Sequence, residues 1–239
     1  DEACLEIQKN KIDGLLFAPV LTNQAEKFLK ENKKFRIPCV LFDSDLPDTD
    51  YIAYIGQDSY QSGTVVAKLM SLMMDKSRKV AVIRVLPGDY HIKERARGFV
   101  EYCASQTGMK CAVYDIEESD NYKAFKALGE RIITENQGSL GGIFVTNDSV
   151  HYIARFMEEI MKEDRIRLIG YDLIKNNTHF LRNGIIDFLI SQHSFTQGYQ
   201  GIHTLFKSVV LREKVKNKIM MPIDIIIREN MEHYENGVE

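Results

Sequence analysis

The sequence predicts an α/β protein built on doubly wound parallel sheets, and two observations lead to this class. Apolar runs of strand length alternate with helical patterns along the whole chain, which favours right-handed parallel crossovers. Most of these runs also lack polar alternation, a pattern that is typical of strands buried on both faces of a parallel sheet.

The individual elements follow from the same two patterns. Eight strands are expected, at Gly14–Pro19, Cys39–Asp43, Ile52–Gly56, Lys79–Val85, Cys111–Asp115, Gly142–Thr146, Arg167–Tyr171 and Asp187–Ser191. Helices are expected where apolar residues recur at helical spacing. These are Gln24–Asn32, Gln61–Met74, Lys93–Gln106, Tyr122–Asn136, Val150–Lys162 and Thr196–Leu211.

The length and composition of the chain limit the classes of function that it can have. The chain has 239 residues, of which 44% are apolar and 27% charged. This allows one α/β domain or two lobes of roughly 100–120 residues each. The net charge of −3 gives no electrostatic footprint for binding a phosphate backbone or an anionic membrane. No apolar stretch is long enough to span a bilayer, so no membrane partner is expected.

The four cysteines, Cys4, Cys39, Cys103 and Cys111, show no metal-ligand spacing. They are interpreted as small buried side chains in a reducing compartment. The sequence therefore predicts no metal site and a cytoplasmic location, and the lack of a signal-peptide pattern in its first residues agrees with that location.

Polar side chains follow most of the expected strands. Ligands of open parallel sheets bind at the carboxyl ends of the strands, so these side chains form the candidate site. They are Asp43, Asp58, Asn147, Asp172 and Gln192, together with Arg95 beyond the fourth strand. Carboxylates accept hydrogen bonds, guanidinium groups donate them and amides do both, so the set can saturate a ring of hydroxyl groups. The balance of acids and base favours a neutral sugar or polyol over a phosphate.

Each of these residues also has a purely structural interpretation. Asp58 and Gln61 fit a helix capping box, Asn147 can cap the helix that follows it, and Asp172 can end its strand in a turn. Arg95 can be a solvated helix residue. Their recurrence at one edge of a sheet favours a common site over these separate roles.

Three aromatic residues are weaker candidates. Tyr90, Tyr122 and Phe17 can stack on the apolar face of a sugar ring. The chain has 11 tyrosines and 12 phenylalanines, so packing in the core or on the surface is the simpler interpretation of each.

Seven short motifs occur in order along the chain. They are KIDGLLFAP (11–19), IPCVLFD (37–43), IGQDSYQSG (55–63), RARGF (95–99), GIFVTND (142–148), LIGYD (168–172), and SQ followed by QG (191–198). In this order and spacing they resemble the effector-binding domains of lactose-repressor-type (LacI family) transcription regulators, close relatives of the periplasmic ribose- and galactose-binding proteins. The resemblance covers essentially the whole chain.

The resemblance implies both a fold and a set of ligand contacts. The fold is two Rossmann-like lobes joined by three crossovers, the type I periplasmic-binding-protein-like fold. The N-terminal lobe is expected at residues 1–77 plus 193–217, and the C-terminal lobe at 78–192 plus 218–239. The family's N-terminal strand and helix have no counterpart in the sequence, and Ser59 stands where the family often has asparagine. The implied sugar contacts are Asp58, Arg95, Asn147, Asp172 and Gln192, which the strand ends also indicate.

The C-terminal segment MPIDIIIREN (221–230) resembles the end of these regulators and favours a sugar-sensing domain of that family. Sugar binding then favours a closed state and changes DNA affinity by the difference in ligand affinity between the two states. Such regulators usually form side-by-side dimers, so a homodimer is expected. Operator DNA is a partner only through a helix-turn-helix outside this chain.

The alternative is an extracytoplasmic sugar-binding protein of a transporter or a membrane receptor, which uses the same two-lobed clamp. An enzyme is not expected, because the chain has no GxSxG, HExxH, P-loop or GxGxxG motif. No cofactor is expected either. Under both sugar-binding hypotheses, Asp172→Ala or Arg95→Ala is expected to abolish the stabilisation by sugar and to leave the melting temperature of the free protein nearly unchanged.

Overall fold

The computed structural model describes residues 6–7, 10, 12–136, 138–160 and 165–236. By their internal contacts, the residues form two compact units. The first unit comprises Asp1–Asp58, Gly88–His91 and Gln192–Pro222, and the second comprises Ser59–Pro87, Ile92–Ser191 and Ile223–Glu239. Apart from the short segment Gly88–His91, the chain therefore passes from one unit to the other three times.

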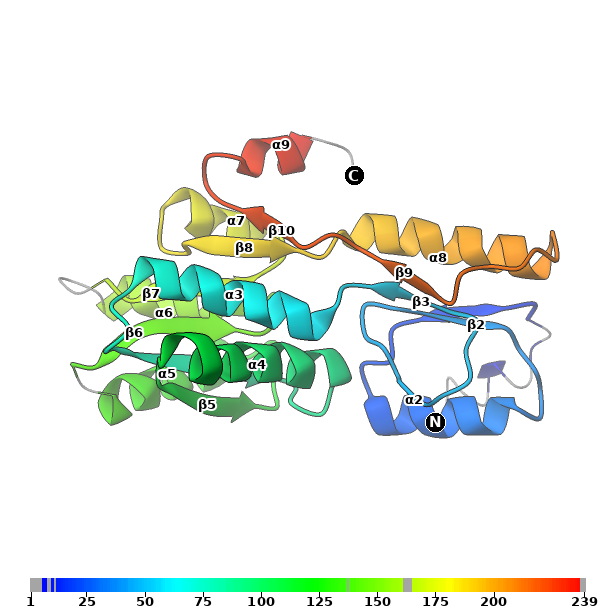
Figure 1. The fold of residues 1–239 in the computed structure, drawn as a ribbon, viewed down its shortest axis with the longest axis horizontal. Coiled ribbons are helices and arrows are strands. Elements are labelled where there is room, and N and C mark those ends of the chain that lie inside the picture. The colour runs from blue at the N-terminus through cyan, green and yellow to red at the C-terminus, as the bar shows by residue number, and fades with distance from the viewer. Residues whose placement is uncertain (1–5, 8–9, 11, 137, 161–164, 237–239) are drawn as a thin grey trace. The chain divides into compact units, whose positions relative to one another are not determined.

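The first unit is a parallel sheet with α2 (Thr22–Asn32) on one face and α8 (Ser194–Val209) on the other (Figure 1). Its strands lie in the order β1 (Leu15–Phe17), β2 (Cys39–Phe42), β3 (Ala53–Gly56) and β9 (Lys218–Met220). Successive side chains of a strand point to opposite faces. Cys39 and Leu41 accordingly pack with Phe28 of α2, whereas Val40 packs on the face that holds Leu205 of α8.

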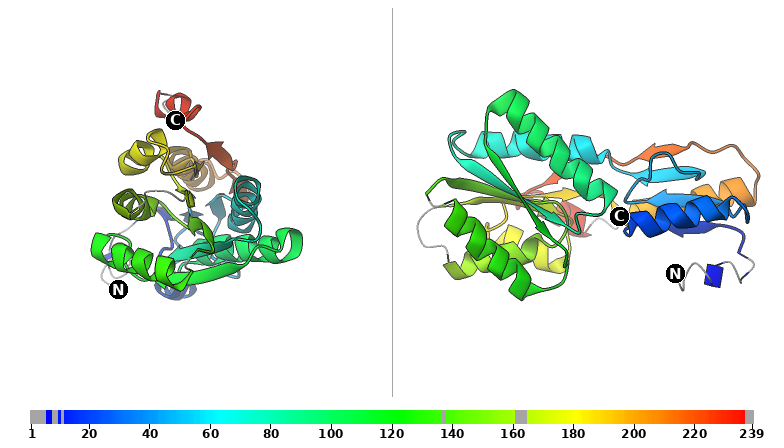
Figure 2. Two further views of the ribbon diagram at one scale, coloured as in Figure 1. Left: turned by 90° about the vertical axis from the view of Figure 1, so that its left-hand side faces the viewer. Right: turned by 90° about the horizontal axis from the view of Figure 1, so that it is seen from below.

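The second unit is a six-stranded sheet with helices on both faces (Figures 1 and 2). The strand order is β10-β8-β7-β6-β4-β5. The strands are β4 (Lys79–Val85), β5 (Cys111–Ile116), β6 (Leu140–Val145), β7 (Arg167–Tyr171), β8 (Phe188–Ser191) and β10 (Asp224–Ile226). They pair in parallel except for β10, which pairs antiparallel with β8.

The helices of the second unit divide between the two faces of its sheet. One face holds α3 (Ser59–Met73) and α4 (Tyr90–Tyr102), and α4 continues into the π-helical turn η1 (Cys103–Thr107). The other face holds α5 (Tyr122–Glu135), α6 (Val150–Ile160), α7 (Lys175–Arg182) and α9 (Met231–Asn236). Val80 and Val82 of β4 pack with α3 and α4, while Ala81 and Ile83 pack with α5 and α6. Both sides of β4 are therefore apolar, which explains the missing polar alternation in its sequence.

The expected strands and helices are present with end points that differ by a few residues, and the α/β fold with Rossmann-like lobes is confirmed. The end of the expected helix Val150–Lys162 lies outside the described residues, as does Cys4. Four elements were not expected, namely α7, β9, β10 and α9, because segments this short carry too few residues for a periodic pattern. β10 makes the second sheet mixed rather than wholly parallel.

The grouping of α3 differs from the lobe boundaries drawn from the sequence. The sequence places residues 59–77 in the N-terminal lobe, whereas the contacts of α3 group it with the second unit. The physical reason is the burial of apolar side chains. Val66, Ala67 and Met70 on α3 are fully buried in a cluster that also contains Val82 and Phe144.

α8 buries one face and leaves an apolar stripe on the other. Gln197, Gly201 and Thr204 are buried, whereas the large side chains at helical spacing on the opposite face are about half exposed: Phe195, Tyr199, Ile202 and Phe206. An exposed stripe of this kind can pack against another apolar surface. No helix in the described part of the chain, α8 included, is long and apolar enough to cross a membrane.

Helices α3 and α4 touch through their backbones at two glycines. A Cβ atom on Gly63 of α3 would lie 1.9 Å from the carbonyl oxygen of Arg95, and a Cβ atom on Gly98 of α4 would lie 2.0 Å from the carbonyl oxygen of Tyr60. Non-bonded atoms do not approach this closely, so the contact requires the missing side chain of glycine. Both glycines belong to motifs that the sequence already shows, IGQDSYQSG and RARGF.

We expect Gly63→Ala and Gly98→Ala each to lower the free energy of unfolding by about 1–3 kcal/mol, because the added methyl group forces α3 and α4 apart. Gly198→Ala on α8 is the matched control, since a Cβ atom there meets no atom within 4 Å. Urea unfolding followed by circular dichroism measures the three midpoints. Wild-type midpoints for both test variants would show that the helices do not depend on this contact.

Candidate functional site

The second sheet has a topological switch point where β4 and β6 lie side by side. β4 leads through α4 to β5 on one side, whereas β6 leads through α6 to β7 on the other. Open α/β sheets bind ligands at such points, outside the carboxyl ends of the strands. The residues that follow β4, β6 and β7 therefore form the core of the candidate site.

Arg95 of α4 lies at this switch point with its side chain fully buried. Its Nη1 donates a hydrogen bond of 2.8 Å to the carbonyl oxygen of Thr146, which directly follows β6. Its guanidinium carbon lies 3.9 Å from the centroid of the Tyr171 ring, a cation–π contact that offsets part of the cost of burying the charge. Burial raises the pKa of Tyr171, and the Tyr171 hydroxyl forms a 2.8 Å hydrogen bond with Ser62 of α3.

This environment corrects two expectations about Arg95. Complete burial excludes the interpretation as a solvated helix residue. The bond to Thr146 and the contact with Tyr171 also give the side chain a role in the free protein. Arg95→Ala is therefore expected to lower the melting temperature without ligand, contrary to the expectation from the sequence.

Asn147 and Asp172 lie close together because they follow the neighbouring strands β6 and β7. The Tyr171 N–H donates to the Asn147 carbonyl oxygen at 3.3 Å, and Asn147 Oδ1 accepts from the Ser149 N–H at 3.1 Å. Asp172 adopts a left-handed backbone conformation with φ of 62°, and both it and Asn147 are half-buried. The second unit thus brings Arg95, Asn147 and Asp172 to one edge of its sheet.

Asn177, which the sequence analysis did not single out, fixes the two loops at this edge. It is the third residue of α7 and is fully buried. Its Nδ2 donates to the carbonyl oxygens of Asp148 at 2.9 Å, Tyr171 at 2.8 Å and Asp172 at 3.0 Å. The sequence does show an asparagine five residues after Asp172. Because α7 was not expected, nothing in the sequence indicated that this side chain turns back to the end of β7.

Gln197 has the same function in the first unit. This buried residue of α8 accepts a 2.8 Å hydrogen bond at Oε1 from the Asp43 N–H, and its Nε2 donates at 2.7 Å to the carbonyl oxygen of Gln192. One side chain therefore joins the candidate residues Asp43 and Gln192. Asp58, the last residue of the first stretch of this unit, is exposed.

Tyr90 lies in the segment Gly88–His91, which Asp89 attaches to the first unit. The buried Asp89 Oδ1 accepts a 2.7 Å hydrogen bond from Ser44 Oγ and lies 3.0 Å from His91 Nδ1. Burial by itself raises the pKa of this carboxyl, but the hydrogen bonds from His91 and Ser44 outweigh burial and lower the pKa of Asp89 overall. An ionised Asp89 therefore holds the half-buried Tyr90 next to the loop that follows β2.

Phe17 and Tyr122 have the packing role that the sequence left open. Phe17 forms an edge-to-face pair with Phe28 at a centroid distance of 5.9 Å. Tyr122 stacks on Tyr152 of α6 at 6.3 Å and forms a hydrogen bond through its hydroxyl with Glu159. The rings of both residues and the Tyr122 hydroxyl therefore contribute to packing between elements of their own unit.

The chemistry that these edges offer is hydrogen bonding. The sheet edge of the second unit carries a cation, an amide and a carboxylate. The first unit, taken by itself, carries the carboxylates of Asp43 and Asp58 and the amide of Gln192. Among the described residues, no group of three His, Cys, Asp or Glu side chains could hold a metal ion together. Each of these two sets suits a ligand that presents several hydroxyl groups.

Comparison with known families and solved structures agrees with this architecture. Residues 6–210 match the family described as periplasmic binding protein domain. A provisionally assigned LacI transcriptional regulator from Bacteroides fragilis superimposes with a TM-score of 0.89 at 26% identity, over 98% of this chain and 81% of that chain. GanP, a glucose-galactose binding protein from Geobacillus stearothermophilus, gives a TM-score of 0.86 at 20% identity, over 96% of this chain and 81% of that chain. The fold is therefore of the type I periplasmic-binding-protein-like class.

A curated protein is also similar in sequence. The xylose/arabinose-binding protein XylF from Sulfolobus acidocaldarius is 21% identical over 202 residues, which cover 78% of this chain and 49% of that protein. The chain thus spans about half the length of this relative.

We expect Asn177→Asp to lower the free energy of unfolding by about 1–3 kcal/mol or more, because a carboxylate oxygen replaces the group that donates to three carbonyl oxygens. Asn176→Asp is the matched control, since Asn176 is the neighbouring residue of α7 and is exposed. Thermal unfolding of both variants measures the difference. Equal melting temperatures for the two would show that Asn177 does not hold the loops after β6 and β7.

Proposed function

The chain belongs to the periplasmic binding protein domain family, and from this premise we propose that it binds a neutral sugar without transforming it. The observation that carries the proposal is the grouping of Arg95, Asn147 and Asp172 at the switch point of the second sheet. The charges of Arg95 and Asp172 offset each other, which favours a neutral ligand. Their donors and acceptors match the hydroxyl groups of a sugar ring.

We also propose that four residues of the first unit are sugar contacts. These are Asp58, Gln192, Asp43 and Tyr90. The hydrogen bonds of Gln197 to Asp43 and Gln192 support this assignment, because a side chain that fixes two strand ends also fixes the polar groups that follow them. The names of GanP and XylF, a glucose-galactose and a xylose/arabinose binder, favour a monosaccharide.

The first candidate for the biological role is the sugar-sensing domain of a LacI-type regulator that acts in the cytoplasm as a homodimer. The likeness to the Bacteroides fragilis protein supports it, as does the C-terminal segment at residues 221–230. In this role, the sugar changes operator affinity only by the difference in its own affinity for the two protein states. The DNA contact is made by a helix-turn-helix outside the 239 residues.

The second candidate is an extracytoplasmic sugar-binding protein that serves a transporter or a membrane receptor. The names of GanP and XylF favour this role. Both roles use the same sugar site, so the site and the role require separate experiments.

We expect D-xylose, L-arabinose, D-galactose or D-glucose to raise the melting temperature of the protein. A ligand at about 100 times its dissociation constant adds about 2.7 kcal/mol of stability. Asp172→Asn is expected to remove the shift, and asparagine tolerates the left-handed backbone at this position. Asp115→Asn is the control, because Asp115 forms a surface ion pair with Arg84. The site assignment is wrong if Asp172→Asn responds to the best sugar as the wild type does.

The two roles make opposite predictions for the native, full-length product of the gene. For the regulator, gel retardation is expected to show binding to the DNA upstream of its own gene, with an affinity that changes when the best sugar is added. For the sugar-binding protein of a transporter, cell fractionation is expected to recover it outside the cytoplasm, and it retards no DNA. Sugar-independent DNA binding, or none at all, contradicts the regulator role.

A further inference from the structure

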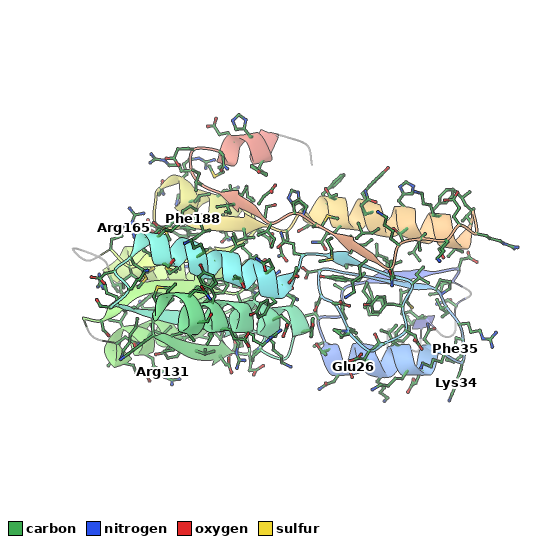
Figure 3. All side chains as sticks on the ribbon, viewed as in Figure 1. Glu26, Lys34, Phe35, Arg131, Arg165 and Phe188 are labelled. Atoms are coloured by element: carbon green, nitrogen blue, oxygen red, sulfur yellow. The ribbon has the colours of Figure 1, made fainter. Side chains whose placement is uncertain are left out.

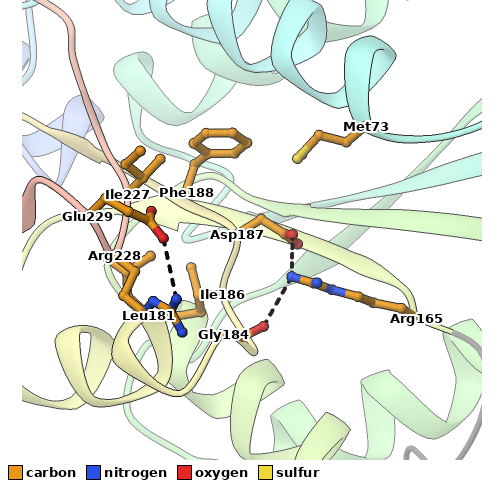
Figure 4. Close-up of a pocket in the computed structure, with 10 residues that line it drawn as sticks. All are labelled: Met73, Arg165, Leu181, Gly184, Ile186, Asp187, Phe188, Ile227, Arg228 and Glu229. Carbon is orange, nitrogen blue, oxygen red and sulfur yellow. Dashed lines mark hydrogen bonds and ion pairs between the residues drawn. The ribbon is translucent and has the colours of Figure 1, made fainter.

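A pocket lies in the second unit, at the amino ends of β7 and β8. It has a volume of about 400 Å³, which falls in the range of small-molecule sites. Arg165 and Phe188 lie at this edge (Figure 3), and the close-up shows the full lining (Figure 4). The lining residues are Met73, Arg165, Leu181, Gly184, Ile186, Asp187, Phe188, Ile227, Arg228 and Glu229.

The pocket is separate from the proposed sugar site. β7 begins at Arg167, next to the pocket, and its carboxyl end carries Asp172. A strand of five residues spans roughly 16 Å at about 3.3 Å per residue. The pocket and the sugar-binding edge therefore lie at opposite ends of the same strand.

One wall of the pocket holds a cluster of ion pairs around Asp187. The nearly buried Asp187 accepts hydrogen bonds at Oδ1 from Arg165 Nη2 at 2.7 Å and from Arg167 Nη1 at 3.1 Å. Its Oδ2 accepts from the Leu168 N–H at 2.9 Å. Two guanidinium groups thus compensate one carboxylate.

Arg228 has a different environment from Arg165. It forms a 3.5 Å ion pair with the adjacent Glu229, and both side chains are more than 60% exposed. An ion pair this exposed is weak, so the Arg228 guanidinium can exchange Glu229 for another anion. The charged residues of the lining, Arg165 and Arg228 against Asp187 and Glu229, balance one another. Arg167 lies outside the lining but pairs with Asp187, so with its charge included the ion-pair cluster at the pocket carries one net positive charge.

The opposite wall is apolar. In Figure 4, the Phe188 ring, Ile227 and Met73 lie on the side of the pocket away from the Arg165 and Arg228 guanidinium groups. A ligand that fills the pocket therefore meets an apolar surface on one side and the N–H donors of two guanidinium groups on the other.

We propose that this pocket is a second ligand site, which binds a small monoanion with an apolar body, such as an aromatic carboxylate. The carboxylate accepts hydrogen bonds from Arg228 and Arg165, and the ring packs against Phe188 and Ile227. The single negative charge balances the excess positive charge of the site. Sugar binding and anion binding are then properties of two different sites on one unit.

Benzoate tests the proposal, with benzamide as its neutral isostere and acetate as the anion without an apolar body. Titration of the protein followed by NMR is expected to give saturable shifts with benzoate, and at least tenfold weaker binding of benzamide and acetate. Raising the salt concentration is expected to weaken benzoate binding, because the contact is partly exposed and ionic. Equal binding of benzamide, equal binding of acetate, or no binding of benzoate overturns the proposal.

Three variants locate the binding. Arg228→Gln is expected to weaken benzoate binding at least fivefold, whereas Glu229→Gln is expected to strengthen it by removing the competing carboxylate. Arg131→Gln is the matched control and is expected to have no effect, since this exposed arginine pairs with Glu135 on α5, away from Arg165 and Phe188 (Figure 3). The sugar-site variant Asp172→Asn should keep wild-type affinity for benzoate. Wild-type binding by Arg228→Gln, or loss of binding in Asp172→Asn, rules out this pocket as the site.

Discussion

A guanidinium group without access to water must be held by the protein on every side, and the second unit is arranged around that requirement at Arg95. The Thr146 carbonyl oxygen accepts a hydrogen bond from Arg95 Nη1, and the Tyr171 ring covers the face of the guanidinium group. Tyr171 is in turn held by Ser62 of α3. This packing demands that α3 and α4 approach closely, which the absence of side chains at Gly63 and Gly98 allows. The charge at the switch point is therefore coupled to the packing of two helices.

Each unit uses the side-chain amide of one buried residue to hold the loops that follow its strands. In each, a buried amide in the first turn of a helix forms hydrogen bonds with backbone groups of two loops, each of which follows a strand. Asn177 joins the loops after β6 and β7, and Gln197 joins Asp43 to Gln192. A buried carbonyl or N–H group costs free energy when it has no partner, so each amide both satisfies the backbone and fixes the side chains proposed to bind the ligand.

The two ends of β7 differ in chemistry although they belong to one strand. At its carboxyl end, Asp172 and the neighbouring Asn147 offer a balanced set of donors and acceptors that suits hydroxyl groups. At its amino end, Arg165 and Arg167 share one carboxylate, that of Asp187, next to an apolar wall. The proposed ligand classes differ because the local charge balance differs, while the sheet supplies the same rigid support to both.

The sequence by itself determined the α/β class, the strands β1 to β8 and most helices, because local periodicity reflects which faces a segment buries. It also placed Asp58, Asn147, Asp172 and Gln192 at strand ends, since these are positions along the chain. Only the tertiary structure decided that Arg95 is buried, that α3 belongs to the second unit, and that Asn177 and Gln197 hold the strand ends. It also added the short elements β9 and β10, which pair with strands distant in sequence. These features depend on contacts between residues far apart in the chain, and no local pattern records such contacts.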